Sequence, residues 1–173
     1  QIDYLKRNEQ IQNLNKNDFY IINDEFVIAN SFGKVQIVDP RRFSILSTQH
    51  HSGMTNCVAV AVPYIVSGGS DTVIACSERK KEDFNSIFSI PTYTNEVVCV
   101  AASKDFHVAV SGTSGGFLIV QSLEKGKMTN YIDLKENRKP SQILVTRGWG
   151  FIVVYTTRKS DNKIVHEILV FTF

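Results

Sequence analysis

The tripeptide Val66-Ser67-Gly68 recurs 44 residues later as Val110-Ser111-Gly112. A further step of 44 from Val108-Ala109-Val110 reaches Ile152-Val153-Val154, and a step back of about 38 from Val66 reaches Ile28-Ala29-Asn30. A constant spacing of this length is typical of a chain built from repeated structural units. We therefore predict four related units.

The sequence around these tripeptides has the pattern of β-strands. Val97–Ala102, Phe106–Val110 and Phe117–Val120 are short, rich in β-branched residues and close to a period of two. Polar or glycine-bearing breaks separate them, as at Ser103–Asp105 and Gly112–Gly116. A helical period of 3.6 residues does not persist anywhere for three turns, so we expect an all-β protein.

The four units cover residues 10–49, 50–91, 92–136 and 137–173. The first three have room for four strands each, and the last ends after its third strand. Residues 1–9 are expected to be the tail of a preceding blade or a linker, with Ile2–Leu5 as a strand. Because the chain begins at Gln1 and ends within the apolar run Ile168–Phe173, we expect residues 1–173 to be a fragment of one domain.

Units of about 40–45 residues with four antiparallel strands are typical of a β-propeller of the WD-repeat type. One four-stranded sheet has two apolar faces and cannot cover both, whereas sheets stacked around an axis cover each other. The prediction is a partial WD-repeat-type β-propeller of about four four-stranded antiparallel blades, the last one incomplete.

The composition narrows the classes of function. Apolar residues make up 43% of the chain, charged residues 21%, and the net charge is +2, which does not favour nucleic acid as a partner. The apolar runs are shorter than the roughly 18 residues of a membrane helix, so we expect no transmembrane segment. Cys57, Cys76 and Cys99 lie in apolar runs without a CxxC pair, which indicates buried free thiols.

The second unit carries the most specific motif. His50–Val60 resembles the WD-repeat opening Gly-His-x-x-x-Val-x-x-Val-Ala-x, and Ser67–Asp71 resembles Ser-Gly-Ser-x-Asp. In that family a His, a Ser, an Asp and a Trp form a buried hydrogen-bonded chain. The resemblance implies that His51, Ser67 and Asp71 take the first three places.

The position of the family's Trp falls near Cys76 or Ser77, so that link is missing. A Ser, a His and an Asp are also the residue types of a catalytic triad. Because the repeat already gives His51, Ser67 and Asp71 a structural role, we predict no catalytic residues and no enzyme activity.

Two further motifs are set aside on physical grounds. Gly112–Gly116 fits Gly-x-Ser-x-Gly, but a strand and not a helix follows it, so it is expected to be a hairpin loop. His50 and His51 are adjacent, and a strand would direct them to opposite faces. We therefore predict neither a metal site nor a cofactor.

Two stretches resemble a narrower family, the BEACH-domain proteins related to beige, neurobeachin and LRBA. Cys99–Gly112 is similar to a repeat near their carboxyl end, and Ile143–Tyr155 is similar to divergent protist members. The resemblance covers about residues 50–173. It implies a piece of the C-terminal propeller of a large cytoplasmic scaffold in vesicle trafficking or lysosome-related membrane processes, which binds other proteins and contacts membranes only peripherally through the parent protein.

Protein binding by such a module is expected at the loops of one rim. The expected loops are Ser31–Lys34, Gly68–Thr72, Gly112–Gly116 and Thr157–Lys163. His50, Tyr93 and Arg158 are the side chains expected to contact a partner. The alternatives are a propeller enzyme (a hydrolase or a cofactor-dependent dehydrogenase), a WD-repeat scaffold of an unrelated complex, and a structural fragment with no partner of its own.

Overall fold

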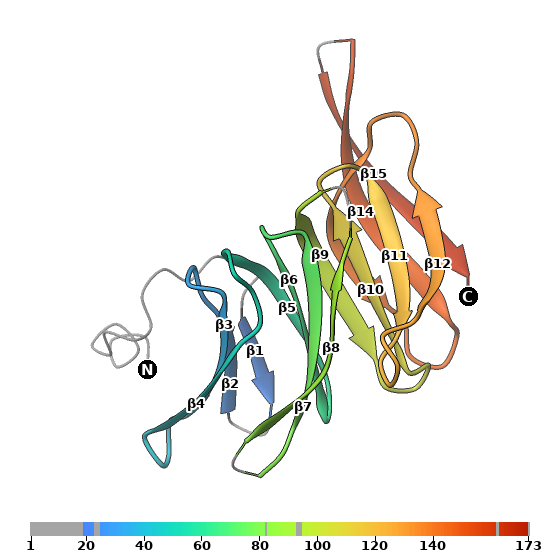
Figure 1. The fold of residues 1–173 in the computed structure, drawn as a ribbon. Helices are drawn as coiled ribbons and strands as arrows, with labels where there is room; N and C mark the ends of the chain where they lie inside the picture. The colour runs from blue at the N-terminus through green and yellow to red at the C-terminus, as the bar shows by residue number, and fades with distance from the viewer. Residues whose placement is uncertain (1–18, 23–24, 82, 93–94, 162, 173) are drawn as a thin grey trace.

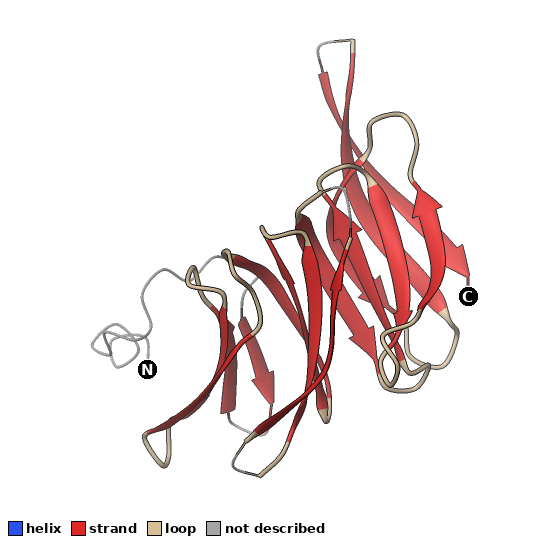
Figure 2. Cartoon of the chain, viewed as in Figure 1, coloured by secondary structure: helices blue, strands red, loops and turns tan. Residues whose placement is uncertain are grey.

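The structure of this chain is a computed structural model, which describes residues 19–22, 25–81, 83–92, 95–161 and 163–172. The predicted strand at Ile2–Leu5 lies outside the described residues. Within the described part, all regular structure is β, in fifteen strands joined by turns and loops (Figures 1 and 2).

The strands form four antiparallel sheets in which every strand pairs with its neighbour along the chain. The first sheet contains β1 (Phe19–Ile22), β2 (Glu25–Ala29), β3 (Lys34–Asp39) and β4 (Ser44–Gln49). The second contains β5 (Thr55–Ala61), β6 (Tyr64–Gly69), β7 (Val73–Arg79) and β8 (Phe84–Pro91). The third contains β9 (Val97–Ser103), β10 (Val108–Thr113), β11 (Phe117–Ser122) and β12 (Met128–Asp133). The terminal sheet contains β13 (Lys139–Val145), β14 (Phe151–Ser160) and β15 (Lys163–Thr172).

The four sheets stack as successive blades (Figure 1), which confirms the predicted all-β partial propeller with an incomplete last blade. One apolar cluster lies between each pair of neighbouring sheets; Val66 belongs to the one between the second and third, and Val110 to the one between the third and terminal sheets. β9, the first strand of the third sheet, contacts the first strands of both neighbouring sheets, β5 and β13, so these three strands are the innermost. The middle strands of the second and third sheets have a neighbouring sheet on both faces. Their sequences are therefore apolar at nearly every position.

The fourth unit departs from the repeat. A constant step of 44 equates Val110 with Val154, which would direct both side chains away from the preceding sheet. Instead Val110 and Val154 face each other in the cluster between the third and terminal sheets. Side chains alternate between the two faces of a strand, so the spacing between equivalent residues of the third and fourth units must be an odd number. An error of one residue in this spacing assigns every side chain of the strand to the wrong face.

The prediction of a loop at Thr157–Lys163 is wrong. β14 continues to Ser160 and β15 begins at Lys163, in register from the Thr157–His166 pair to the Ser160–Lys163 pair. The hairpin projects beyond the rest of the terminal sheet (Figure 1). Charged residues in this stretch suggested a loop, but they occupy positions in a two-stranded ribbon where side chains reach water.

A glycine on the second sheet packs directly against a side chain of the third sheet. A Cβ added to Gly68 on β6 would overlap the side chain of Val97 on β9. We expect Gly68→Ala to lower the free energy of unfolding by about 1–3 kcal/mol, the usual cost of overpacking.

The measurement is urea unfolding of the two single variants and of Gly68→Ala combined with Val97→Ala. Removing the Val97 methyl groups takes away the closest overlap, although Val97 Cβ and Cys57 Sγ would still crowd the added methyl group. Val97→Ala should therefore cost less in the Gly68→Ala background than alone. Strictly additive effects would contradict this packing.

Candidate functional site

The second sheet contains a hydrogen-bonded chain of buried polar side chains. His51, in the loop between β4 and β5, has its Nε2 2.8 Å from Ser67 Oγ on β6. Its Nδ1 lies 3.0 Å from Oδ1 of Asp71, in the turn between β6 and β7. The structure thus brings together the three residues that the WD-repeat resemblance selected.

His50 and Ser77 extend this chain. His50 Nδ1 lies 2.6 Å from Ser67 Oγ, and its Nε2 lies 2.7 Å from Ser77 Oγ on β7. Ser77 stands at one of the two positions where the family's Trp was expected. The imidazole of His50 bridges Ser67 and Ser77, a link that sequence comparison could not show because the family has Gly at this place.

This placement corrects the prediction for His50. We expected His50 to contact a partner, but it is half-buried and both of its ring nitrogens are hydrogen-bonded inside the blade. It is therefore a structural residue of the second sheet.

The direction of each hydrogen bond follows from Asp71. A carboxylate only accepts, so His51 Nδ1 carries the proton and its Nε2 accepts from the Ser67 hydroxyl. Ser67 Oγ then accepts from His50 Nδ1–H, and His50 Nε2 accepts from the Ser77 hydroxyl. All four hydrogen bonds are satisfied when both imidazoles are neutral.

Electrostatics favour the same state. Burial, reinforced by the repulsion that protonation of both His50 and His51 would create, lowers the pKa of His50 from 6.5 to about 4. Burial also lowers the pKa of His51, although Asp71 opposes the effect. Burial alone would raise the pKa of Asp71, but the backbone N–H of Ser52, the His51 ring and the backbone N–H of Val73 together hold it below its ordinary value.

The network holds the loop between β4 and β5 in place and does not expose a nucleophile. Asp71 also accepts hydrogen bonds from the backbone N–H groups of Ser52 at 2.9 Å and Val73 at 3.3 Å, so it joins the loop before β5 to the β6–β7 turn. Ser67 is fully buried and its oxygen lies between two imidazoles. No substrate can reach that hydroxyl without opening the blade.

The other two predicted contact residues have different placements. Tyr93 lies outside the described residues. Arg158 lies within β14 and not on a loop; its Nε donates to Glu167 at 3.0 Å, and its Nη1 lies 3.6 Å from Glu136. Glu167 also accepts from Arg138 Nε at 2.7 Å. Arg158 is therefore half-buried in an ion-pair cluster that holds the base of the projecting hairpin.

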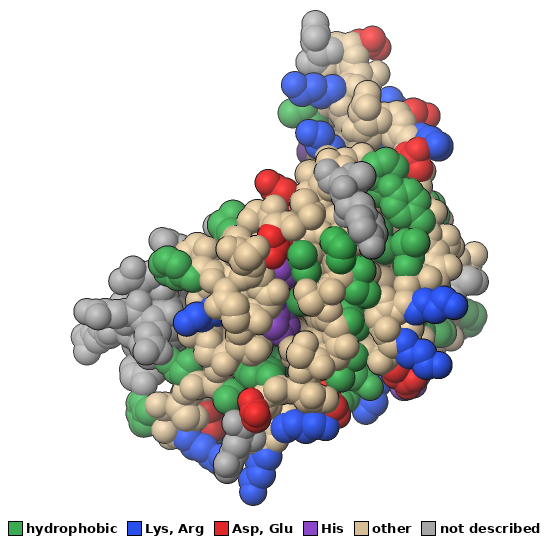
Figure 3. Space-filling model, viewed as in Figure 1, with side chains coloured by type: hydrophobic (Ala, Val, Ile, Leu, Met, Phe, Trp, Pro, Cys, Tyr) green, Lys and Arg blue, Asp and Glu red, His purple; other side chains and the backbone are tan. Residues whose placement is uncertain are grey.

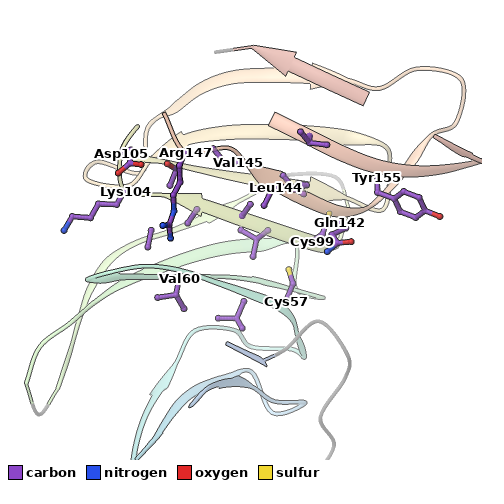
Figure 4. A pocket seen from close by; sticks show the side chains of 18 of the residues that line it. Cys57, Val60, Cys99, Lys104, Asp105, Gln142, Leu144, Val145, Arg147 and Tyr155 are labelled. Atoms are coloured by element: carbon purple, nitrogen blue, oxygen red, sulfur yellow. The ribbon is translucent and has the colours of Figure 1, made fainter. Parts of the chain in front are cut away.

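Sequence reasoning missed a groove of about 1120 Å³ along the innermost strands (Figure 4). Its apolar lining includes Val60 of β5, Ala102 of β9 and Leu144 of β13. Lys104, Asp105 and Arg147 lie at one end, and Gln142 and Tyr155 lie toward the other (Figure 4). No short motif marks this site, because its residues come from three units and meet only when the blades stack.

The charged end of the groove belongs to the rim opposite the predicted loops. The turns there join the first strand of each blade to the second, as at Lys104–His107 and Thr146–Gly150. Trp149 is 79% exposed in the second of these turns, where Gly148 and Gly150 have positive φ angles of 78° and 66°. An exposed Trp beside Arg147 is the residue combination that dominates protein interfaces.

The described residues show no group of three or more His, Cys, Asp or Glu side chains arranged to hold a metal ion. They also include no helix of the length and hydropathy needed to cross a bilayer. On the face shown in Figure 3, basic side chains are scattered among acidic ones.

No protein-family model and no curated protein sequence matches the chain. Solved structures match it well. The computationally designed Ika4 protein has a TM-score of 0.70 at 14% identity over 88% of this chain and 90% of that one. The Cps50 (Swd1) β-propeller domain of Myceliophteria thermophila has a TM-score of 0.69 at 12% identity over 80% of this chain and 49% of that one.

A chain of the Mitotic Checkpoint Complex has a TM-score of 0.69 at 13% identity, over 88% of this chain and 52% of its own length. The chain thus spans about half the length of these two matched chains. At such low identity the similarity shows the fold, which is a WD40-like β-propeller.

The two buried serines at matching places in the second and third sheets offer a direct comparison. Ser67→Ala leaves one nitrogen of His50 and one of His51 unpaired, which costs about 1–3 kcal/mol for each group. Ser111 makes only a 3.4 Å bond to the carbonyl of Ile119. We expect urea unfolding to show a clearly larger loss of unfolding free energy for Ser67→Ala than for Ser111→Ala. Equal losses would mean that the hydrogen-bonded network around Ser67 contributes no stability.

Stability should fall between neutral pH and about pH 4. The unfolded chain binds a proton at His50 near pH 6.5, whereas the folded chain does so only near pH 4. The unfolded state therefore holds more protons in this interval, and the free energy of unfolding drops as the pH is lowered. The drop from His50 is on the order of 3 kcal/mol.

Urea unfolding at a series of pH values between 4 and 7 measures this dependence. His50→Gln removes the titrating group, so its profile should be flatter than that of the unaltered chain. Identical slopes would show that His50 does not carry the dependence.

Proposed function

We propose that this chain is a protein-interaction module without enzyme activity. WD40-type propellers typically serve as protein-binding scaffolds, and the fold of this chain is of that type. The polar residues that resemble a catalytic triad are used inside the blade, where Ser67 has no access to solvent. The lining of the groove along the innermost strands contains a single carboxylate, Asp105, and no histidine.

The observation that carries this proposal is the groove together with the Trp149 turn at its charged end. The apolar lining of the groove can accommodate every second side chain of an extended partner segment. The exposed Trp149 can anchor that segment at the charged end of the groove. Proteins commonly use rigid strands to hold such turns for recognition.

The charges at this end define the partner's chemistry. Lys104 and Arg147 are exposed, and within the described part of the chain no carboxylate lies within ion-pair distance of either. Asp105 contributes one negative charge beside these two cations. The partner is therefore an extended protein segment with apolar residues and at least one acidic residue near Trp149.

A narrower proposal concerns the parent protein. The similarity of Cys99–Gly112 and Ile143–Tyr155 to BEACH-domain proteins supports a place in the C-terminal propeller of a cytoplasmic scaffold at vesicle or organelle membranes. The coding sequence upstream of Gln1 tests this proposal: a BEACH module there supports it, and an unrelated domain contradicts it.

Selection of peptides from a random displayed library tests the binding surface. The unaltered chain should enrich peptides with acidic and apolar residues, and Trp149→Ala should reduce the enrichment about tenfold or more, as for an interface anchor. Arg147→Glu should shift the selection toward basic peptides, because it reverses the charge at the end of the groove.

Lys125→Glu is the matched control, since Lys125 is an exposed residue of the β11–β12 turn outside the groove lining. It should leave the selected peptides unchanged. A selection that is the same for Arg147→Glu as for the unaltered chain would refute the groove as the binding site.

A further inference from the structure

The turn between β3 and β4 contains a motif that blade packing does not explain. Its sequence is Arg41-Arg42-Phe43-Ser44-Ile45, and it includes the only pair of adjacent arginines in the chain. Arginine-directed serine/threonine protein kinases select a serine with arginine at the third and second places before it and an apolar residue directly after it. Acidic side chains of such a kinase pair with the two guanidinium groups of the substrate. Ser44 meets each of these requirements.

The structure presents this motif to solvent. Arg41, Arg42, Phe43 and Ser44 are all exposed, and Phe43 is exposed by 71%. Ser44 is the first residue of β4, which is the outermost strand of the first sheet. Within the described part of the chain, the Ser44 hydroxyl makes no hydrogen bond. Because the turn lies at the tip of the first sheet (Figure 1), an enzyme can approach Ser44 from outside the stack.

The interactions that shape the turn favour its local opening. Asp39 Oδ1 accepts exposed hydrogen bonds from the backbone N–H groups of Arg41 at 2.9 Å and Arg42 at 3.2 Å. Arg42 Nε lies 3.6 Å from Asp39 Oδ2, but the Arg42 side chain is 83% exposed, and an ion pair this open to water is weak. Phe43 has a positive φ angle of 54°, which is strained for a bulky side chain. Opening into the extended form that a kinase cleft binds therefore costs little free energy.

We propose that Ser44 is a phosphorylation site for an arginine-directed serine/threonine protein kinase. The kinase transfers the terminal phosphoryl group of ATP to Ser44 Oγ. The bond between this phosphorus and the bridging oxygen of ATP breaks, a bond between Ser44 Oγ and phosphorus forms, and ADP leaves. The hydroxyl proton of Ser44 passes to the catalytic base of the kinase.

The modification reverses the charge of the turn. Two arginines, Arg41 and Arg42, and one aspartate, Asp39, give it a net charge of +1. A phosphoserine adds about −1.5 to −2 at neutral pH. The strand register places Ser44 directly opposite Asp39, so the phosphate and this carboxylate form one negative site at the end of the first sheet. Phosphorylation therefore changes a basic turn into an acidic one.

Treatment of the folded full chain with cyclic-AMP-dependent protein kinase and ATP tests the proposal. Mass spectrometry of the intact chain should show the addition of one phosphoryl group, and fragment spectra should place it on Ser44. Ser44→Ala should abolish the addition and keep the circular dichroism spectrum, because Ser44 is exposed. Arg42→Ala should lower kcat/KM of the kinase for this chain about tenfold or more.

The matched control is Ser47→Ala. Ser47 is an exposed serine on the same strand, but Ser44 and Ile45 stand at the third and second places before it. This variant should be phosphorylated like the unaltered chain. A synthetic peptide of residues 38–48 shows whether the kinase accepts the motif outside the fold.

Three outcomes would overturn the proposal. They are a peptide that is phosphorylated while the folded chain is not, a peptide and a chain that both stay unmodified, and a modification that persists in Ser44→Ala. The test is separate from peptide binding in the groove, because Ser44 does not line the groove. Ser44→Ala should retain peptide selection, and Arg147→Glu should retain phosphorylation at Ser44.

Discussion

Each sheet in this chain has two apolar faces, and neither face is stable in water without a neighbouring layer. Val66 and Val110 are fully buried because a further sheet packs on each of them. The requirement explains why the middle strands are apolar at consecutive positions and why the outermost strand β12 is exposed over most of its length. It also gives the chain its order, since each blade covers the one before it.

Apolar packing alone leaves the loops between blades unspecified, and the second blade adds a polar constraint. Asp71, His51, Ser67, His50 and Ser77 form one chain of hydrogen bonds with a single consistent direction. Such a network is worth little if one member is unsatisfied, so it defines one arrangement of the loop before β5. The third blade has Ser111 but Gly115 at the place of Asp71, so it lacks the carboxylate that begins this network, and apolar clusters pack on both of its faces.

The sequence predicted the features that depend on spacing along one unit. The repeat gave four sheets, and the separations of His51, Ser67 and Asp71 selected three residues that do meet. It did not predict features that depend on the relation between units. His50 bridges Ser67 and Ser77, and Ser77 stands where the family has a Trp. The odd offset before Val154 exchanges the faces to which the side chains of β14 point. The groove joins residues of three blades. Repeat matching compares residues along the chain and contains no information on which side chains meet across it.

The projecting hairpin has a consequence for how this protein can be handled. β13 pairs with β14 only as far as Thr157, so the ribbon beyond it, up to the turn between Ser160 and Lys163, has no third strand. The ion pairs of Arg158 and Arg138 with Glu167 close its base and separate it from the packed blades. A reporter domain or affinity tag spliced in at this tip would disturb no layer of the stack, which makes the turn a natural attachment point for labels.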